Sequence, residues 1–231
     1  DRTVRLAVDF SPAHVCVFPV SVRHAGIPLY RRQQSLPSRD RTRRMYDRAL
    51  EYLLSHGYQR TTRHNFARNS CTFVYERSIA ELTPLIGFGA NSISYAGGCI
   101  YRNHSDLSAY ARALECDETP IRAGHVFADD EQPHNYIVRR IEYLRIDGMD
   151  FASRFKVGLR EMFGDEVTLL EDTGLGGMDG ADLVLSDEGV FYTSAVKRLF
   201  FHRSAWHRLR SMQSGEFVIE RGVLSGPANE S

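Results

Sequence analysis

The sequence lacks paired cysteines, an excess of charge and a long apolar run, and each absence excludes a class of protein. Cys16, Cys71, Cys99 and Cys116 lie far apart without a Cys-x-x-Cys pair, so we expect buried thiols and no zinc ribbon or dithiol redox centre. The 29 basic and 29 acidic residues balance, so no overall field attracts nucleic acid or anionic membranes. No segment approaches the roughly 18 apolar residues of a membrane-spanning helix. We therefore expect a cytoplasmic protein with no nucleic-acid or membrane partner.

The composition is that of a folded domain. The chain has 231 residues, and 42% of them are hydrophobic, which suffices for one large domain or for a domain with a small appendage. The chain starts without Met and enters an amphipathic pattern at once, with Val4, Leu6, Ala7 and Phe10 on one face. We expect this sequence to be a piece of a longer protein.

The first region alternates between strand and helix patterns. The run HVCVFPVSV (14–22) is typical of a strand covered on both faces, as in a parallel sheet, and Pro19 favours its edge. The basic stretch that follows is interpreted as a solvated loop. Leucines at helical spacing then predict a helix over 38–56, which Gly57 ends with a left-handed cap. The segments YQRTTRHNFAR and CTFVYERS are predicted to be strands. This alternation indicates an α/β fold.

A glycine-rich stretch, GFGANSISYAGGCIYRN (87–103), is the most unusual part of the sequence. It fails the dinucleotide-binding pattern because Ser92 stands where the third glycine is needed, and no lysine follows as in a phosphate-binding loop. Two interpretations stay open. Gly87, Gly89 and Ala90 could bring backbone close to a ligand that Asn91 and Ser92 hydrogen-bond, or they could serve a tight crossing from strand to turn.

The rest of the chain predicts helices around a small hairpin. One helix follows a cap at Asn103, Ser105 or Asp106, and a second follows a cap at Asp129 and ends at Gly148. We expect their apolar stripes to lie in a core; these are Leu107, Tyr110, Ala111 and Leu114, then Tyr136, Ile137, Ile141 and Leu144. Two short helices around Gly164, a strand bounded by glycine turns and a closing helix follow, an order typical of a winged-helix-like module.

The order of these motifs resembles the later part of the oxygen-independent coproporphyrinogen III oxidase-like radical SAM family. The matching segments cover residues 10–200: HVCVFPVSVRHAGIPLYRR, YDRALEYLLSHGYQRTTRHNFAR, GFGANSIS with YRN and a later Leu and Tyr, and a final GL followed by LSDEG. The resemblance implies the C-terminal part of a partial (β/α)6 barrel, followed by the small, mainly helical, winged-helix-like domain. It also implies a small-molecule substrate and, for the intact protein, a monomer.

The resemblance implies a site for S-adenosylmethionine and substrate. By analogy, Gly87, Gly89, Ala90, Asn91 and Ser92 line its cavity, and Phe18, Val20 and Ser21 support the adenosyl group. The family's Cys-x3-Cys-x2-Cys, which holds a 4Fe-4S cluster, is absent from this chain. We therefore expect the missing N-terminal half of the barrel to carry the cluster, or else the activity to be lost.

Other functions stay open beside this one. The intact enzyme could decarboxylate a porphyrinogen propionate oxidatively, or transfer a methyl or methylene group. The His-Asn-x-x-Tyr-Trp segment of haem-chaperone members is replaced here by NSCTFVYERS, so a haem-binding or haem-trafficking role would depend on a residue such as His64. A winged-helix binding module would use KRLFFHRSAWHRLR, although Leu199, Phe200, Phe201 and Trp206 are typical of a docking face.

These interpretations divide the chain into four parts. Residues 1–115 would form the end of the barrel with the cavity segment, and residues 116–148 a helical connector. Residues 149–212 would form the small C-terminal domain, and residues 213–231 a flexible tail.

Overall fold

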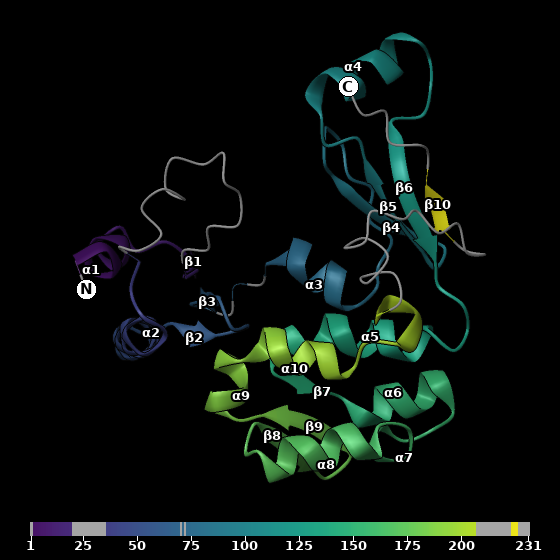
Figure 1. The fold of residues 1–231 in the computed structure, drawn as a ribbon. Coiled ribbons are helices and arrows are strands. Elements are labelled where there is room, and N and C mark those ends of the chain that lie inside the picture. The colour runs from purple at the N-terminus through teal and green to yellow at the C-terminus, as the bar shows by residue number, and fades with distance from the viewer. Residues whose placement is uncertain (1, 20–35, 70, 72, 207–222, 226–231) are drawn as a thin grey trace. The chain divides into compact units, whose positions relative to one another are not determined.

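A computed structural model describes residues 2–19, 36–69, 71, 73–206 and 223–225 (Figure 1). The chain divides into two compact units, Asp1–Phe73 and Val74–Ser231. Both are mixed α/β, with small sheets and no closed barrel among the described residues. No helix in this part of the chain combines the length and apolar character needed to cross a bilayer.

The N-terminal unit is a three-stranded sheet with two helices. Its elements are α1 (Arg2–Asp9), β1 (His14–Cys16), α2 (Arg39–Ser55), β2 (Gln59–Arg60) and β3 (Asn65–Ala67), and the strand order is β1-β3-β2. The helix predicted over 38–56 is confirmed. It begins where the Ser38 hydroxyl accepts a hydrogen bond from the Arg41 amide, and it ends before Gly57, whose φ is +81°.

The parallel pairing predicted for 14–22 is wrong for the described residues of that run. β1 pairs antiparallel with β3, with Val15 opposite Phe66, and residues 20–22 lie outside the described part of the chain. The prediction that this strand is covered on both faces is also wrong for these residues, because Val15 is only half-buried and Cys16 is exposed. A continuous apolar run does not show the direction of the partner strand. Here the buried Phe66 and Asn65 lie on that partner.

A four-stranded antiparallel sheet carries the glycine-rich stretch in the C-terminal unit. It is formed by β4 (Ile93–Ala96), β5 (Cys99–Asn103), β6 (Ile121–Val126) and β10 (Val223–Ser225), in the order β10-β6-β5-β4. Gly97 and Gly98 turn between β4 and β5 with φ of +57° and +73°, a conformation that glycine adopts without strain. α4 (Leu107–Glu115) follows, and the predicted cap at Asp106 is confirmed by its hydrogen bond from the Ala109 amide.

Helices surround a second, smaller sheet in the same unit. Figure 1 shows α5 (Gln132–Arg140) and α10 (Thr193–Leu199) above β7 (Arg145–Ile146), β9 (Asp182–Leu185) and β8 (Gly176–Asp179), which pair in the order β7-β9-β8. The remaining elements are η2 (Ile141–Tyr143), α6 (Gly148–Phe155), α7 (Leu159–Met162), α8 (Gly164–Asp172) and α9 (Asp187–Phe191). The hairpin after residue 174 is as predicted, but three helices, α6, α7 and α8, stand where two short helices around Gly164 were predicted.

The main hydrophobic core lies between these helices and the small sheet. The predicted Tyr136, Ile137 and Ile141 are buried in it, together with side chains from residues 146–200 such as Phe151 and Phe163. This core crosses the predicted connector boundary at 148/149. The structure divides the chain into two units after Phe73. The predicted domain boundaries at 115, 148 and 212 stay a prediction.

Several local predictions are wrong. CTFVYERS contributes to a helix, α3 (Val74–Ala80), which an Arg77–Glu81 ion pair of 2.7 Å supports. The second predicted cap is displaced, because Glu131 and not Asp129 precedes α5. β6 was not anticipated. The side chains of Leu107 and Leu114 are 71% and 51% exposed instead of lying in a core.

The expectation of buried thiols is also wrong. Cys16 and Cys116 are exposed, and Cys71 and Cys99 are half-buried. The Cys16 thiol donates a hydrogen bond of 2.8 Å to the side-chain oxygen of the buried Asn65. The sequence spacing of single cysteines contains no information about such local polar contacts.

Candidate functional site

The segment before β4 is irregular chain that one β-bridge, between Leu85 and Tyr95, joins to the sheet, and its backbone amides alternate between two environments. On one side, every second amide donates to the rest of the unit, and the acceptors are as follows: the Tyr95 carbonyl for Leu85 (2.7 Å), the Ser94 hydroxyl for Gly87 (3.0 Å), the Tyr110 hydroxyl for Gly89 (3.2 Å) and the His104 carbonyl for Asn91 (2.7 Å). The intervening amides donate no hydrogen bond to the sheet.

These intervening amides belong to Ile86, Phe88 and Ala90, and residues 86–90 are called the open edge here. None of the three amides has a hydrogen-bond partner among the described residues. The Ile86 and Phe88 side chains are 63% and 88% exposed. An edge with free donors and exposed apolar side chains is suited to receive a ligand or another strand.

Different reasons explain the two glycines of this segment. A Cβ atom on Gly87 would lie 2.6 Å from the Ile93 carbonyl oxygen, so this glycine permits a tight crossing. Gly89 has a backbone φ of +97°, which residues other than glycine rarely adopt, and a Cβ atom there would meet nothing within 4 Å. The crossing interpretation thus holds for Gly87, and Gly89 faces open space.

The buried Asn103 fixes this loop from β5. Its side-chain amide donates hydrogen bonds of 3.1 Å to the Gly89 carbonyl and to the Ser92 hydroxyl, and that hydroxyl donates to the same carbonyl at 2.7 Å. Asn91 occupies the left-handed region with a φ of +62°. Ser92 and Asn91 therefore shape the loop. Sequence reasoning considered Asn103 only as a helix cap, although a polar residue that ends a strand is also typical of such a role.

The other predicted site residues belong to the N-terminal unit. Phe18 is 62% exposed, and its ring stacks on His64 with 4.4 Å between ring centroids. The His64 ring nitrogen Nδ1 donates to the Val17 carbonyl at 3.0 Å. Val20 and Ser21 lie outside the described residues. A common site for these residues and the glycine-rich loop stays a prediction, because the two groups belong to different units.

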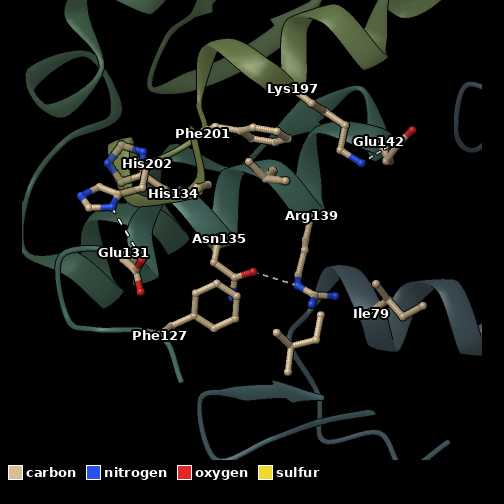
Figure 2. Close-up of a pocket in the computed structure, with 13 residues that line it drawn as sticks. Ile79, Phe127, Glu131, His134, Asn135, Arg139, Glu142, Lys197, Phe201 and His202 are labelled. Carbon is tan, nitrogen blue, oxygen red and sulfur yellow. Dashed lines mark hydrogen bonds and ion pairs between the residues drawn. The ribbon is translucent and has the colours of Figure 1, made fainter. Parts of the chain in front are cut away.

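A separate cavity of about 380 Å³ lies within the C-terminal unit (Figure 2). Its residues come from α3, β5, the turn before α5, α5 itself, η2, α10 and the turn after α10. The lining consists of Ile79, Ile100, Phe127, Glu131, His134, Asn135, Val138, Arg139, Glu142, Lys197, Phe201, His202 and Ala205. The surface of its wall is mainly apolar, and its charged side chains lie at different places along the wall.

One end of the cavity is organised by the carboxylate of Glu131, which is only 5% exposed. It accepts hydrogen bonds from the Ser204 hydroxyl, from the Ala128 amide at 3.0 Å and from His125 Nε2 at 2.7 Å. Burial would raise the pKa of Glu131, but the Ser204 and Ala128 hydrogen bonds and the His125 ring outweigh it and lower the pKa to about 2. This carboxylate is therefore ionised at neutral pH, and hydrogen bonds from the protein stabilise its charge.

Two histidines lie beside this carboxylate. The rings of His134 and His202 meet edge to face with 4.9 Å between centroids, and His134 Nδ1 lies 3.0 Å from the Phe200 carbonyl. Burial lowers the pKa of His134, although the Phe200 carbonyl opposes this effect. His134 is thus a neutral donor at physiological pH, and it holds the end of α10 against α5.

The middle of the cavity contains the guanidinium of Arg139. Its Nε donates to the Asn135 side-chain oxygen at 3.0 Å, and its Cζ lies 5.0 Å from the centroid of the Tyr95 ring. Burial lowers the pKa of Arg139, but an arginine stays charged at neutral pH. Sequence reasoning missed this residue. Its signal was the spacing of polar residues at 131, 135 and 139, one helical turn apart on a helix with a buried face.

The described residues do not fit an iron-sulfur cluster. All four cysteines belong to the described part of the chain, and no three His, Cys, Asp or Glu side chains in that part gather into a metal-binding group. A 4Fe-4S cluster requires thiolates that converge on one site. No step of chemistry is therefore assigned to a cluster held by these residues.

The basic segment after residue 196 packs mainly inward. Phe200 is fully buried in the core, Leu199 packs against it, and Lys197 forms a 2.6 Å ion pair with Glu142. Leu199 and Phe200 therefore pack onto the chain's own core, as their apolar character predicted. Trp206 is 40% exposed beside Phe201, and residues 207–222 lie outside the described part.

Comparison with known proteins gives a match in structure but not in sequence. No protein-family model matches the chain, and no curated protein does. The solved structure of coproporphyrinogen III oxidase from Escherichia coli, a radical SAM enzyme, superposes with a TM-score of 0.72 and 18% identity. The alignment covers 87% of this chain and 50% of that enzyme, so the chain spans about half the length of the structure it matches. The chain therefore shares the fold of the matched half of a radical SAM coproporphyrinogen III oxidase.

Proposed function

We propose that this chain is the C-terminal part of a radical SAM enzyme of the oxygen-independent coproporphyrinogen III oxidase type. The observation that carries the proposal is the structural match over 87% of the chain. The order of the sequence motifs over residues 10–200 also supports it. The substrate class would be a small molecule, either a porphyrinogen that is oxidatively decarboxylated or an acceptor of a methyl or methylene group.

The chain's own contribution would be one wall of the S-adenosylmethionine site. The open edge supports this role, because the amides of Phe88 and Ala90 are free to donate and Gly89 faces open space. Phe88 adds a flat, exposed aromatic side chain that can contact an adenine ring. The cluster, which supplies the electron that starts the reaction in such enzymes, would be held by cysteines outside this chain. The intact enzyme would be a cytoplasmic monomer.

Ala90→Val tests the ligand role of the open edge in the intact protein. The added methyl groups should obstruct a ligand that approaches the backbone, so we expect affinity for S-adenosylmethionine or substrate to fall at least tenfold. The free energy of unfolding should change by less than about 1 kcal/mol, because volume is not added to a packed core. Isothermal titration and denaturant unfolding measure the two quantities on one sample.

Gly87→Ala is the matched control. Its Cβ would press on the Ile93 carbonyl oxygen, so it should cost about 1–3 kcal/mol of stability without changing affinity per folded molecule. If Ala90→Val behaves like this control, with lost stability and unchanged affinity, the open edge is structural and does not bind the ligand.

A second expectation concerns the cluster. Anaerobic incubation of this chain with iron and sulfide should give no stoichiometric iron and no broad charge-transfer absorption, because its cysteines do not converge. The intact protein, treated identically, should acquire both. Cluster assembly on this chain alone would contradict the assignment of the ligands to the missing half.

A further inference from the structure

The cavity of the C-terminal unit contains a cation without a carboxylate partner. Among the described residues, no Asp or Glu side chain lies within ion-pair distance of Arg139, and its terminal nitrogens Nη1 and Nη2 have no hydrogen-bond partner. Its neighbours differ. Arg140 lies 3.2 Å from Asp150, and Lys197 lies 2.6 Å from Glu142. Burying an arginine without an acidic partner is destabilising unless a bound ligand supplies the opposite charge.

The other charges of the lining are compensated within the protein. The Glu131 carboxylate accepts three hydrogen bonds, and the Lys197 ammonium is paired with Glu142. His202 Nε2 lies 3.5 Å from Asp130. Arg139 is therefore the lining residue whose charge is available to a bound molecule, within the part of the chain that the structure describes.

The position of the guanidinium is fixed before any ligand arrives. The Asn135 side-chain oxygen holds Nε at 3.0 Å, and the Tyr95 ring lies under the guanidinium plane. Figure 2 shows the guanidinium end between Asn135 and Ile79. A guanidinium held through Nε and one face presents its two terminal nitrogens as a fork, which matches the two oxygens of a carboxylate.

We propose that this cavity binds a small amphiphilic monocarboxylate, with the carboxylate on Arg139 and the apolar body against Ile79, Ile100, Phe127, Val138 and Phe201. The apolar wall favours a hydrocarbon or aromatic body over a sugar phosphate. A single available cation suits a monoanion better than a phosphate dianion. A volume of about 380 Å³ lies near the lower limit of small-molecule sites and is too small for a tetrapyrrole. None of residues 86–90 lines this cavity, so the proposal does not depend on the proposed radical SAM site.

The test uses a matched pair of probes on the whole chain. 3-Phenylpropionate and its uncharged analogue 3-phenylpropanamide are titrated while backbone and arginine Nε–H resonances are followed by NMR. The acid should shift the Arg139 Nε–H resonance and bind at least tenfold more tightly than the amide. Arg139→Gln should weaken binding of the acid about ten- to hundredfold, as expected for a lost charge-assisted hydrogen bond, and should leave binding of the amide unchanged.

Controls keep the proposal falsifiable. Arg122→Gln removes the same charge from an exposed position on β6 and should leave both affinities unchanged. Thermal unfolding shows whether Arg139→Gln is folded. If it is not, the response of the Arg139 resonance in the unaltered chain decides. Equal affinity for acid and amide, or saturation by the acid without a shift at Arg139, would overturn the proposal.

Discussion

Glu131→Gln should lower the free energy of unfolding of the C-terminal unit by about 3 kcal/mol. The Glu131 carboxylate accepts from Ser204, Ala128 and His125 at once, and a carboxamide has only one accepting oxygen. The amide nitrogen of glutamine would face donors, which leaves a buried donor unsatisfied at a cost of about 1–3 kcal/mol in addition to the lost charge. Urea unfolding followed by circular dichroism measures the difference.

The pH dependence of stability provides a second measure of the same group. The pKa of Glu131 is lowered from 4.5 to about 2, so the unfolded chain binds this proton more tightly than the folded chain. The contribution is fully present above about pH 4.5 and disappears as the pH falls toward 2. At roughly 1.4 kcal/mol for each pH unit of difference, it amounts to about 3 kcal/mol. The variant should lose this acid-dependent part of the curve.

Glu118→Gln is the control, because Glu118 is exposed and precedes β6 in the same unit. It should change stability by less than about 0.5 kcal/mol at any pH between 3 and 7. Stability of Glu131→Gln that follows the same pH curve as the unaltered chain would show that folding does not lower the pKa of Glu131.

The elements that the sequence predicted best have strong local signals. The helix at 39–55 has a serine cap and a terminal glycine that act as expected, and Leu53 of its leucine repeat is buried, whereas Leu54 is exposed. The hairpin of β8 and β9 follows from its glycine turn in the same way. Such signals depend on residues that are close in sequence, so one chain suffices to read them.

The errors concern contacts between distant residues. CTFVYERS has the β-branched and aromatic composition of a strand, yet Val74–Ala80 is helical. The β propensity of such residues comes from side-chain packing on a half-buried sheet, so it does not stabilise a strand where no partner strand is present. The direction of β1 was misjudged for a related reason, because its partner, Asn65–Ala67, is 49 residues further along the chain.

The candidate sites were predicted unequally. The glycine-rich loop was recognised from its composition, but only the structure separates Gly87, which permits a crossing, from the open edge at Phe88 and Ala90. The cavity was missed entirely. Arg139 is one of two adjacent arginines on α5, and nothing in their order shows that Arg140 meets Asp150 while Arg139 meets no carboxylate.

Gly189→Ala should destabilise the C-terminal unit by about 3 kcal/mol or more. A Cβ atom at this position would lie 1.7 Å from the Leu175 carbonyl oxygen, which is a backbone atom and cannot rotate away. The same carbonyl accepts a hydrogen bond of 3.1 Å from the Ser186 amide, and Ser186 in turn caps α9. Overpacking in a core typically costs about 1–3 kcal/mol, and a backbone clash this close should lie at or beyond that range.

This change also tests what the sequence motif GL followed by LSDEG means. Gly174, Leu175, Ser186 and Gly189 belong to this motif, and they contact one another: the Ser186 hydroxyl donates to the Gly174 carbonyl at 2.7 Å. The motif therefore encodes the packing of α9 against the turn after α8. Gly164→Ala is the matched control, because Gly164 begins α8 and a Cβ there meets nothing within 4 Å. It should be neutral or slightly stabilising in the same urea unfolding experiment. Equal stability of the two variants would show that α9 can shift away from Leu175 and that the motif is not a packing constraint.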